Sequence, residues 1–404
     1  MLQALPLVFV LAGVALYTVL AGADFGAGFW QLSAGRGEHA ERVREHAHES
    51  MAPVWEANHV WLIFVLTVFW TAYPGAFEAI FTTLAIPLFI AVFGILFRGA
   101  AYALRAGASS LRESSAIDTI FSLSSIVTPF ALGAAVGGIA SDRVPAVGMG
   151  DMWSSWLNPT SIFIGVLAVS NCAYLSAVYL AADAAGRGEE DLVSAFRSRA
   201  LAIAVVAGAV AFGGLFAINS DDHQLVHSLL SGDALVAVIV SALAGAGTLA
   251  LVYVRRFEAA RYTSAVAVAA VILGWTLARW PTILPGLTID QAAAGHDTLV
   301  WVVVAVLAGG AILFPSLALL FRLTLTGRFA AAEAPPEPAA AALPSFRAGL
   351  LARVSVALLI AGFGGLTVAD AGWAHAIGVV CLFAFVITAF AAIVPGALTG
   401  DSAV

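Results

Sequence analysis

The chain has 404 residues, of which 61% are hydrophobic and 11% are charged, and its formal net charge is −7 at pH 7. Ordinary soluble proteins have about 45–50% apolar and about 25% charged residues, so this chain lacks the charged surface that a soluble domain needs. The composition excludes a soluble fold and indicates an integral membrane protein.

The predicted elements are membrane-spanning helices. A bilayer core of about 30 Å needs roughly 20 apolar residues per helix, and lipid offers the backbone no hydrogen-bond partner. The short alternating stretches typical of a transmembrane barrel are not seen. We therefore predict an all-α, polytopic helix bundle with about eleven transmembrane helices, a nine-span core plus two. The apolar runs cover residues 5–33, 53–73, 78–101, 116–140, 159–185, 199–218, 233–254, 262–280, 298–322, 349–368 and 373–394.

A change of composition divides the chain after the ninth predicted span. Residues 330–344 consist of Pro, Ala, Glu and Leu, a composition typical of a linker. We predict a core at 1–329, a linker at 330–344 and a two-span tail at 345–404. The amino terminus has no positively charged segment before its apolar run, so we expect an uncleaved first span.

The arginines predict the orientation of the chain. All 18 basic residues are arginine, and 16 of them lie in the odd-numbered loops and the span ends beside them. The even-numbered loops hold only Arg143 and Arg279. Because basic residues favour the cytoplasmic side, we expect the amino terminus outside and the carboxyl terminus in the cytoplasm. No basic tract is present, so nucleic acid is not an expected partner.

Five ionisable residues within or at the ends of the predicted spans are candidates for a site. Asp24 lies late in the first span, Glu56 and His59 start the second, Arg98 ends the third and Asp118 starts the fourth. An ionisable group near the bilayer centre costs about 2.5–3.5 kcal/mol and usually faces the protein interior. All five lie toward the cytoplasm in the predicted orientation. We expect them to form one cytoplasm-facing polar cluster.

Glu56 and His59 are three residues apart and share one face of a helix. A carboxylate and an imidazole placed in this way can pass a proton, since histidine titrates near neutral pH. The alternative is that both groups are only wetted at the membrane edge. The neighbouring Trp55 and Trp61 are also compatible with an interfacial aromatic belt.

Other roles stay open for the remaining polar residues. Arg98 also suits a positive-inside anchor, and Asp118 suits a helix cap favoured by the helix dipole. The first loop contains His39, His46 and His48. These residue types can bind metal, but the spacing of His46 and His48 suits a solvated polar helix better, and we predict no metal site.

Several ordered motifs resemble subunit II of the cytochrome bd-type quinol oxidases. The longest is the run MAPVWEANHVWLI at residues 51–63. The segments 22–28, 69–74, 96–98 and 284–289 are similar to the same family in order and spacing. Together they cover about residues 5–330, which include the nine-span core.

The chain departs from the family pattern in four respects near these motifs. Glu56 stands where the family usually has aspartate, and His59 stands where glutamine or glutamate is common. Ala21 replaces an acidic residue often found three positions before Asp24. An acidic residue often found between Arg98 and Arg105 is also missing.

The resemblance implies a subunit of an oxygen-reducing quinol oxidase in the bacterial cytoplasmic membrane. It implies that subunit I carries haem b and haem d, that this chain binds neither haem nor metal, and that it packs against subunit I and contributes to proton uptake. The further partners implied are quinol, membrane lipid and a small accessory single-span subunit, while a quinone bound to this chain stays open. The candidates for the proton pathway are Asp24, Glu56, His59 and Asp118, and the motif residues are Trp55, Asn58, Trp61 and Arg98.

A different class of function stays open from composition alone. A small-molecule or ion transporter could use the same intramembrane carboxylates as coupling sites. The sequence has no convincing internal repeat and no matching pair of broken spans, both of which are typical of many transporters. It does not distinguish ubiquinol from menaquinol. It indicates neither a role for the two extra spans nor the oligomeric state of the complex.

Overall fold

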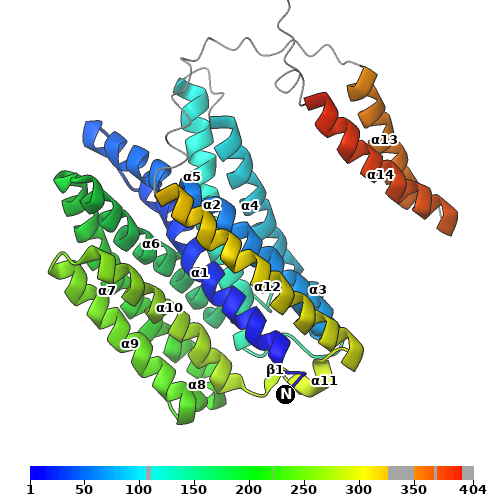
Figure 1. Ribbon diagram of the computed structural model, residues 1–404. Helices are drawn as coiled ribbons and strands as arrows, with labels where there is room; N and C mark the ends of the chain where they lie inside the picture. The colour runs from blue at the N-terminus through cyan, green and yellow to red at the C-terminus, as the bar shows by residue number, and fades with distance from the viewer. Residues whose placement is uncertain (106–110, 222, 326–349, 368–370, 394–404) are drawn as a thin grey trace, which may run out of the picture. The chain divides into compact units, whose positions relative to one another are not determined.

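The computed structural model describes residues 1–105, 111–221, 223–325, 350–367 and 371–393, and the side chains of residues 51–57 and 59 lie outside this description. Helices dominate it, together with one small antiparallel sheet (Figure 1). In chain order the elements are α1 (Leu5–Leu32), α2 (Glu38–Ala72), α3 (Pro74–Thr83), α4 (Ala85–Arg105), α5 (Leu111–Ala140), α6 (Pro159–Arg187), α7 (Glu190–Asp221), α8 (His223–Leu229), α9 (Gly232–Tyr253), α10 (Phe257–Arg279), β1 (Thr282–Leu284), β2 (Leu287–Thr288), α11 (Ile289–Ala292), α12 (His296–Leu325), α13 (Leu350–Thr367) and α14 (Gly372–Ile393).

The fold confirms an all-α bundle of membrane helices. Within the described residues, eight helices are long and apolar enough to cross a membrane, and a bent pair, Val60–Ala72 with Pro74–Thr83, makes up to nine. The predicted number of eleven is not confirmed. In α13 and α14 the described apolar stretches, Arg353–Gly362 and Ala376–Phe385, are too short to count as spans.

The chain forms two compact units, Met1–Phe314 and Pro315–Val404. In the second unit, α13 packs against α14. The predicted linker at 330–344 lies outside the described residues. The predicted division into a 1–329 core and a 345–404 tail stays a prediction.

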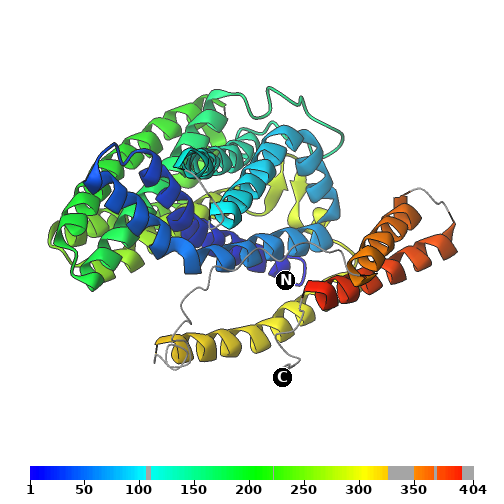
Figure 2. The same ribbon diagram turned by 90° about the horizontal axis from the view of Figure 1, so that it is seen from above.

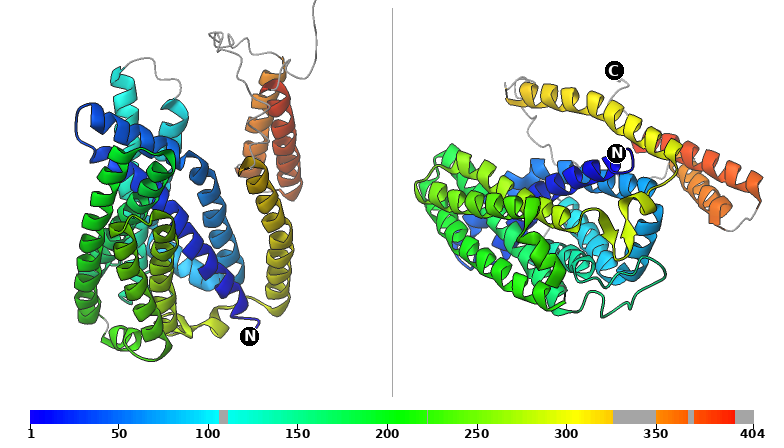
Figure 3. Two further views of the ribbon diagram at one scale, coloured as in Figure 1. Left: turned by 60° about the vertical axis from the view of Figure 1, so that its left-hand side comes forward. Right: turned by 90° about the horizontal axis from the view of Figure 1, so that it is seen from below.

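The first unit is built from two groups of helices. One group contains α1, α2, α4 and α5, and the other contains α6, α7, α9 and α10, as the end-on view in Figure 2 shows. Both α1 and α5 pack against α6, so they join the two groups. In the left view of Figure 3, α1 runs diagonally across this unit, beside the green helices of the second group.

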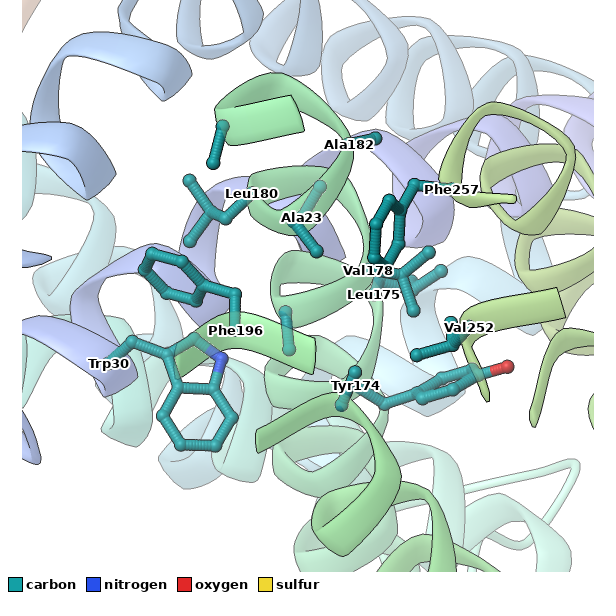
Figure 4. Close-up of a cluster of buried hydrophobic side chains, with 14 of the residues drawn as sticks. Ala23, Trp30, Tyr174, Leu175, Val178, Leu180, Ala182, Phe196, Val252 and Phe257 are labelled. Atoms are coloured by element: carbon teal, nitrogen blue, oxygen red, sulfur yellow. The ribbon is translucent and has the colours of Figure 1, made fainter. Parts of the chain in front are cut away.

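A buried apolar cluster fills the junction of the two groups. It includes Ala23 and Trp30 of α1, Leu175 of α6 and Phe196 of α7 (Figure 4). The indole Nε1 of Trp30 donates a hydrogen bond to the carbonyl oxygen of Ala173 at 2.9 Å, which fixes α1 against α6. Satisfying this buried N–H inside the protein matters because an unpaired one is costly to desolvate.

The largest departure from the predicted elements lies between residues 34 and 85. The first loop is helical and continues into the second span, so α2 has 35 residues, about 52 Å at about 1.5 Å per residue. The helix ends before Pro74, because proline disfavours helical backbone at the preceding residue and lacks an N–H. The short helix α3 then bends away by 119°, and the third span begins at Ala85 rather than at residue 78.

Candidate functional site

A buried ion pair joins α1 to α4. Nη2 of Arg98 donates to Oδ1 of Asp24 at 2.5 Å and to the Asp24 carbonyl oxygen at 3.1 Å. The two side chains are only 2% and 4% exposed. From α2, Nδ2 of Asn58 donates to the other carboxylate oxygen of Asp24 at 3.2 Å. Three helices therefore converge on one carboxylate.

The guanidinium of Arg98 is also held between two aromatic rings. Its central carbon lies 4.7 Å from the ring centre of Phe25 and 4.4 Å from that of Phe121. A cation over the face of a ring is attracted by the ring's negative face. Arg98 therefore does not serve as an exposed positive-inside anchor, which was one of the roles open from sequence. It is an internal cation whose charge is balanced by Asp24.

A small cavity lies against this ion pair. The space open to the centre of a water molecule is about 10 Å³, which is about the amount that one water molecule needs. The cavity is lined by Tyr17, Ala21, Asp24, Phe25, Asn58, Ile95 and Arg98.

A second polar group lies beside the first, around residue 48. Arg105 forms an ion pair with Asp118, and both side chains are about one third exposed. The ring of His48 lies 5.6 Å from that of Tyr102 and 6.3 Å from that of Phe121. Phe121 therefore contacts both His48 of the second group and Arg98 of the first group.

His48 is half-buried, on the part of α2 that precedes its candidate span. Burial, followed by the positive charge of Arg105, lowers the pKa of this imidazole below its usual value of 6.5. The carboxylates of Asp118 and Glu49 oppose this shift, and Arg98 adds to it. A histidine with a lowered pKa is mostly neutral at pH 7, so its ring can accept a proton.

The structure brings together only part of the predicted polar cluster. Asp24 and Arg98 are in contact, and the motif residue Asn58 joins them. Asp118 pairs with Arg105 instead, and because α5 already begins at Leu111, Asp118 does not lie in the first turn as a helix cap would. The side chains of the other α2 candidates, Glu56, His59 and Trp55, lie outside the described residues. The motif residue Trp61 is half-buried and packs edge-on against Phe64, 6.0 Å between ring centres.

Sequence reasoning missed Tyr17 and His48 as neighbours of the site. Tyr17, Ala21 and Asp24 follow the four- and three-residue spacing of one helix face, so the position of Tyr17 was available from the sequence. The position of His48 was not, because its contacts with Tyr102 and Phe121 depend on how helices distant in sequence pack together.

The first-loop segment is helical and carries surface ion pairs, such as Arg42 with Asp191, and its His39 is exposed. The expectation of a solvated helix is wrong for His46, which is buried, and only partly right for the half-buried His48.

His46, in the same segment, is fully enclosed. The side chain of His46 is 2% exposed, and its Nε2 lies 3.1 Å from the carbonyl oxygen of Leu180. A carbonyl can only accept, so Nε2 carries the proton. Asp183 lies 3.8 Å from the same nitrogen. In the described part of the chain, no group of three or more His, Cys, Asp and Glu side chains is placed to hold a metal ion.

Comparison with known proteins decides the family. The model of the family "Cytochrome bd terminal oxidase subunit II" matches residues 2–324. The chain belongs to this family. The match confirms the resemblance seen in the sequence motifs, and it supports an oxidase subunit rather than a transporter.

The individual relatives of this chain are distant from it. The chain is 27% identical to the putative cytochrome bd menaquinol oxidase subunit II of Bacillus subtilis, over 46% of this chain and 54% of that one. It is 26% identical to the cytochrome bd-I ubiquinol oxidase subunit 2 of Escherichia coli, over 43% of this chain and 47% of that one. The chain thus spans about half the length of the curated relatives it matches.

The fold of this chain also occurs in a solved bd oxidase. The bd oxidase from Geobacillus thermodenitrificans matches with a TM-score of 0.66 and 24% identity, and the match covers 80% of this chain and 99% of that one. The shared fold extends over most of the described helices.

Proposed function

We propose that this chain is the subunit of a quinol:oxygen oxidoreductase that carries no haem and packs against a haem-carrying subunit I. The family match over residues 2–324 carries the proposal. The relatives from Bacillus subtilis and Escherichia coli are named as subunits of menaquinol and ubiquinol oxidases. Haem b and haem d are expected in subunit I, and quinol is the expected electron donor of the complex.

Purification from native membranes tests this assignment. A chain tagged at its carboxyl terminus should copurify with a second multi-span subunit, and the complex should show haem absorbance and consume oxygen with quinol. The same chain expressed alone should be free of haem. A stoichiometric haem in the isolated folded chain, or a complex that contains no haem at all, would contradict the assignment.

The second part of the proposal is that the chain contributes to proton uptake from the cytoplasm. Oxygen reduction consumes protons, and a reaction centre inside the membrane needs polar groups that lead to it. The arrangement that supports this role is the buried Asp24 with Arg98 and Asn58, next to the partly exposed Asp118 and His48. In the orientation predicted from the arginines, both groups lie toward the cytoplasm.

Different residues take different parts in this route. Asp24 is held by Arg98 and Asn58, so it acts as a fixed negative charge that stabilises a nearby proton. His48 and Asp118 lie where the protein meets solvent and are placed to take up protons. Glu56 and His59, on the same helix as Asn58, are the titratable groups that continue the route.

A further inference from the structure

Three buried polar atoms beside the Asp24–Arg98 ion pair have no hydrogen-bond partner within the described residues. They are Nε and Nη1 of Arg98 and Oδ1 of Asn58. A guanidinium has five N–H donors, and the printed bonds to Asp24 involve only Nη2. Polar groups buried in this way are usually satisfied by protein or by ordered water.

Arg98 and Asn58 line the same small cavity, and Asp24 also lies in its wall. Its size suits one water molecule. Tyr17 contributes a further polar side chain to the wall, while Ala21, Phe25 and Ile95 contribute apolar surface. The site is thus polar enough and large enough for water, the two conditions that a buried water requires.

The chemistry of the wall selects water over other small ligands. The ligand must accept hydrogen bonds from Arg98 and donate one to Oδ1 of Asn58. A cation cannot accept from a guanidinium and is repelled by it. A halide cannot donate to an amide oxygen and is repelled by Asp24.

We infer that one ordered water molecule is bound between Arg98 and Asn58, next to Asp24, as a fixed part of the fold. Its oxygen faces the guanidinium and one of its hydrogens points to Oδ1 of Asn58. The water holds the plane of the Arg98 side chain between Phe25 and Phe121. Its binding does not depend on proton uptake, and only its use as a link in the proton route rests on the proposed function.

A high-resolution map of the purified oxidase complex tests the site directly. We expect a peak within about 2.7–3.2 Å of an Arg98 nitrogen and of Oδ1 of Asn58, the range of ordinary hydrogen bonds. Buried waters elsewhere in the same map provide the control for sensitivity. A map that shows those waters but no peak here overturns the inference.

Two variants sharpen the test. Asn58→Leu removes the acceptor at similar volume and should abolish the peak, whereas Asn58→Asp keeps an acceptor oxygen and should retain it. A peak that persists at full height in the Asn58→Leu map would overturn the assigned coordination. If either variant fails to assemble, the map of the unaltered complex still decides whether the water is bound.

The proposed function is tested separately by filling the cavity. Ala21→Val adds apolar volume to the wall without removing a polar group, so it should exclude the water. Loss of the peak with a parallel fall in oxygen consumption per haem supports the water as a link in the route. Loss of the peak with unchanged turnover leaves the water site standing and removes it from the proton route.

Discussion

Arg98 carries its charge in an enclosed position, where loss of hydration opposes ionisation. Asp24, Asn58 and the two flanking rings replace the lost water contacts. Such a pair contributes little net stability relative to apolar residues of the same size, yet it is costly to break, because one partner is then left charged and buried. The pair therefore fixes α1, α2 and α4 in one arrangement around the carboxylate.

Removing one partner of the pair should be more harmful than removing both. We expect Asp24→Asn to destabilise the complex by about 3–5 kcal/mol, because Arg98 is left as an uncompensated buried charge. The double variant Asp24→Asn with Arg98→Met should recover part of this loss, since it removes that charge. Thermal unfolding of the assembled complex measures both, and equal stability of the single and double variants would contradict the account.

The lowered pKa of His48 predicts a pH effect with a definite sign. The folded protein holds a proton on this imidazole more weakly than the unfolded chain does, because of burial and Arg105. The stability associated with His48 is therefore fully present above the unfolded pKa of about 6.5 and is lost as the pH falls below it. His48→Gln should flatten the fall in unfolding temperature below about pH 6.5.

The matched control for His48→Gln is His296→Gln. The side chain of His296 is 78% exposed. It should leave the pH profile unchanged. If the His48→Gln and unaltered complexes lose stability in parallel as the pH falls, His48 is not the group responsible.

At the residue scale, the sequence indicated that Asp24 and Arg98 face the protein interior but not that they pair with each other. Asp24 and Arg98 are 74 positions apart, and their contact depends on the packing of α1 against the bundle. Asp118 was predicted to lie near this pair. It forms an ion pair with Arg105 instead, because the ends of α4 and α5 meet there. Spacing along one helix can be read from a sequence, whereas pairing between helices follows from tertiary packing.

At the element scale, α1 is the helix that connects the site to the rest of the fold. One part of it contributes Tyr17, Ala21 and Asp24 to the cavity, while Gly26 allows close contact with α6. A Cβ atom at Gly26 would lie 2.0 Å from the carbonyl oxygen of Cys172. Small residues permit this close approach of helix backbones in membranes.

Gly26→Ala should therefore force α1 and α6 apart. We expect a loss of stability of about 1–3 kcal/mol or more, as for other overpacked interiors, measured by thermal unfolding. The control is Gly245→Ala on α9, where an added Cβ meets nothing within 4 Å. That change should be neutral or stabilise by up to about 1 kcal/mol. Similar losses in the two variants would mean that the α1–α6 contact is not limiting.

The positions of the helices were largely predictable, because long apolar runs have a strong sequence signal. The first loop was predicted to be a polar helix, but its continuation into the second span and the burial of His46 were not predictable, because they depend on the packing of α2. The break at Tyr73–Pro74 has a clear signal in the proline. A hydrogen bond from the backbone N–H of Leu7 to the Tyr73 hydroxyl anchors this break. It joins residues that are distant in the chain, so no sequence pattern predicts it.

At the scale of the whole molecule, the family and the fold agree with the sequence motifs, and the orientation in the membrane is still a prediction. The first unit contains two groups of four long helices, and the sequence motifs fall mainly on the first group. The role proposed for this chain in the assembly is to pair with a haem-carrying subunit and to contribute to proton uptake.

The orientation can be tested across a single helix. A reporter inserted between α8 and α9, near Gly232, should be external, and one inserted between α9 and α10, near Arg255, should be cytoplasmic. A reporter after Val404 should also be cytoplasmic. These sides follow from the 16 arginines of the odd-numbered loops and span ends. An external signal near Arg255 would reverse the orientation and place the Asp118 group on the wrong side for uptake from the cytoplasm.

The central claim is that this subunit supplies protons for oxygen reduction, and oxygen consumption per haem in complexes with altered Glu56 tests it most directly. Glu56→Gln removes the titratable group and nearly preserves its shape, so haem content should persist while oxygen consumption falls. Glu56→Asp keeps a carboxylate and should retain partial activity. Full turnover by a Glu56→Gln complex with normal haem content would contradict the claim.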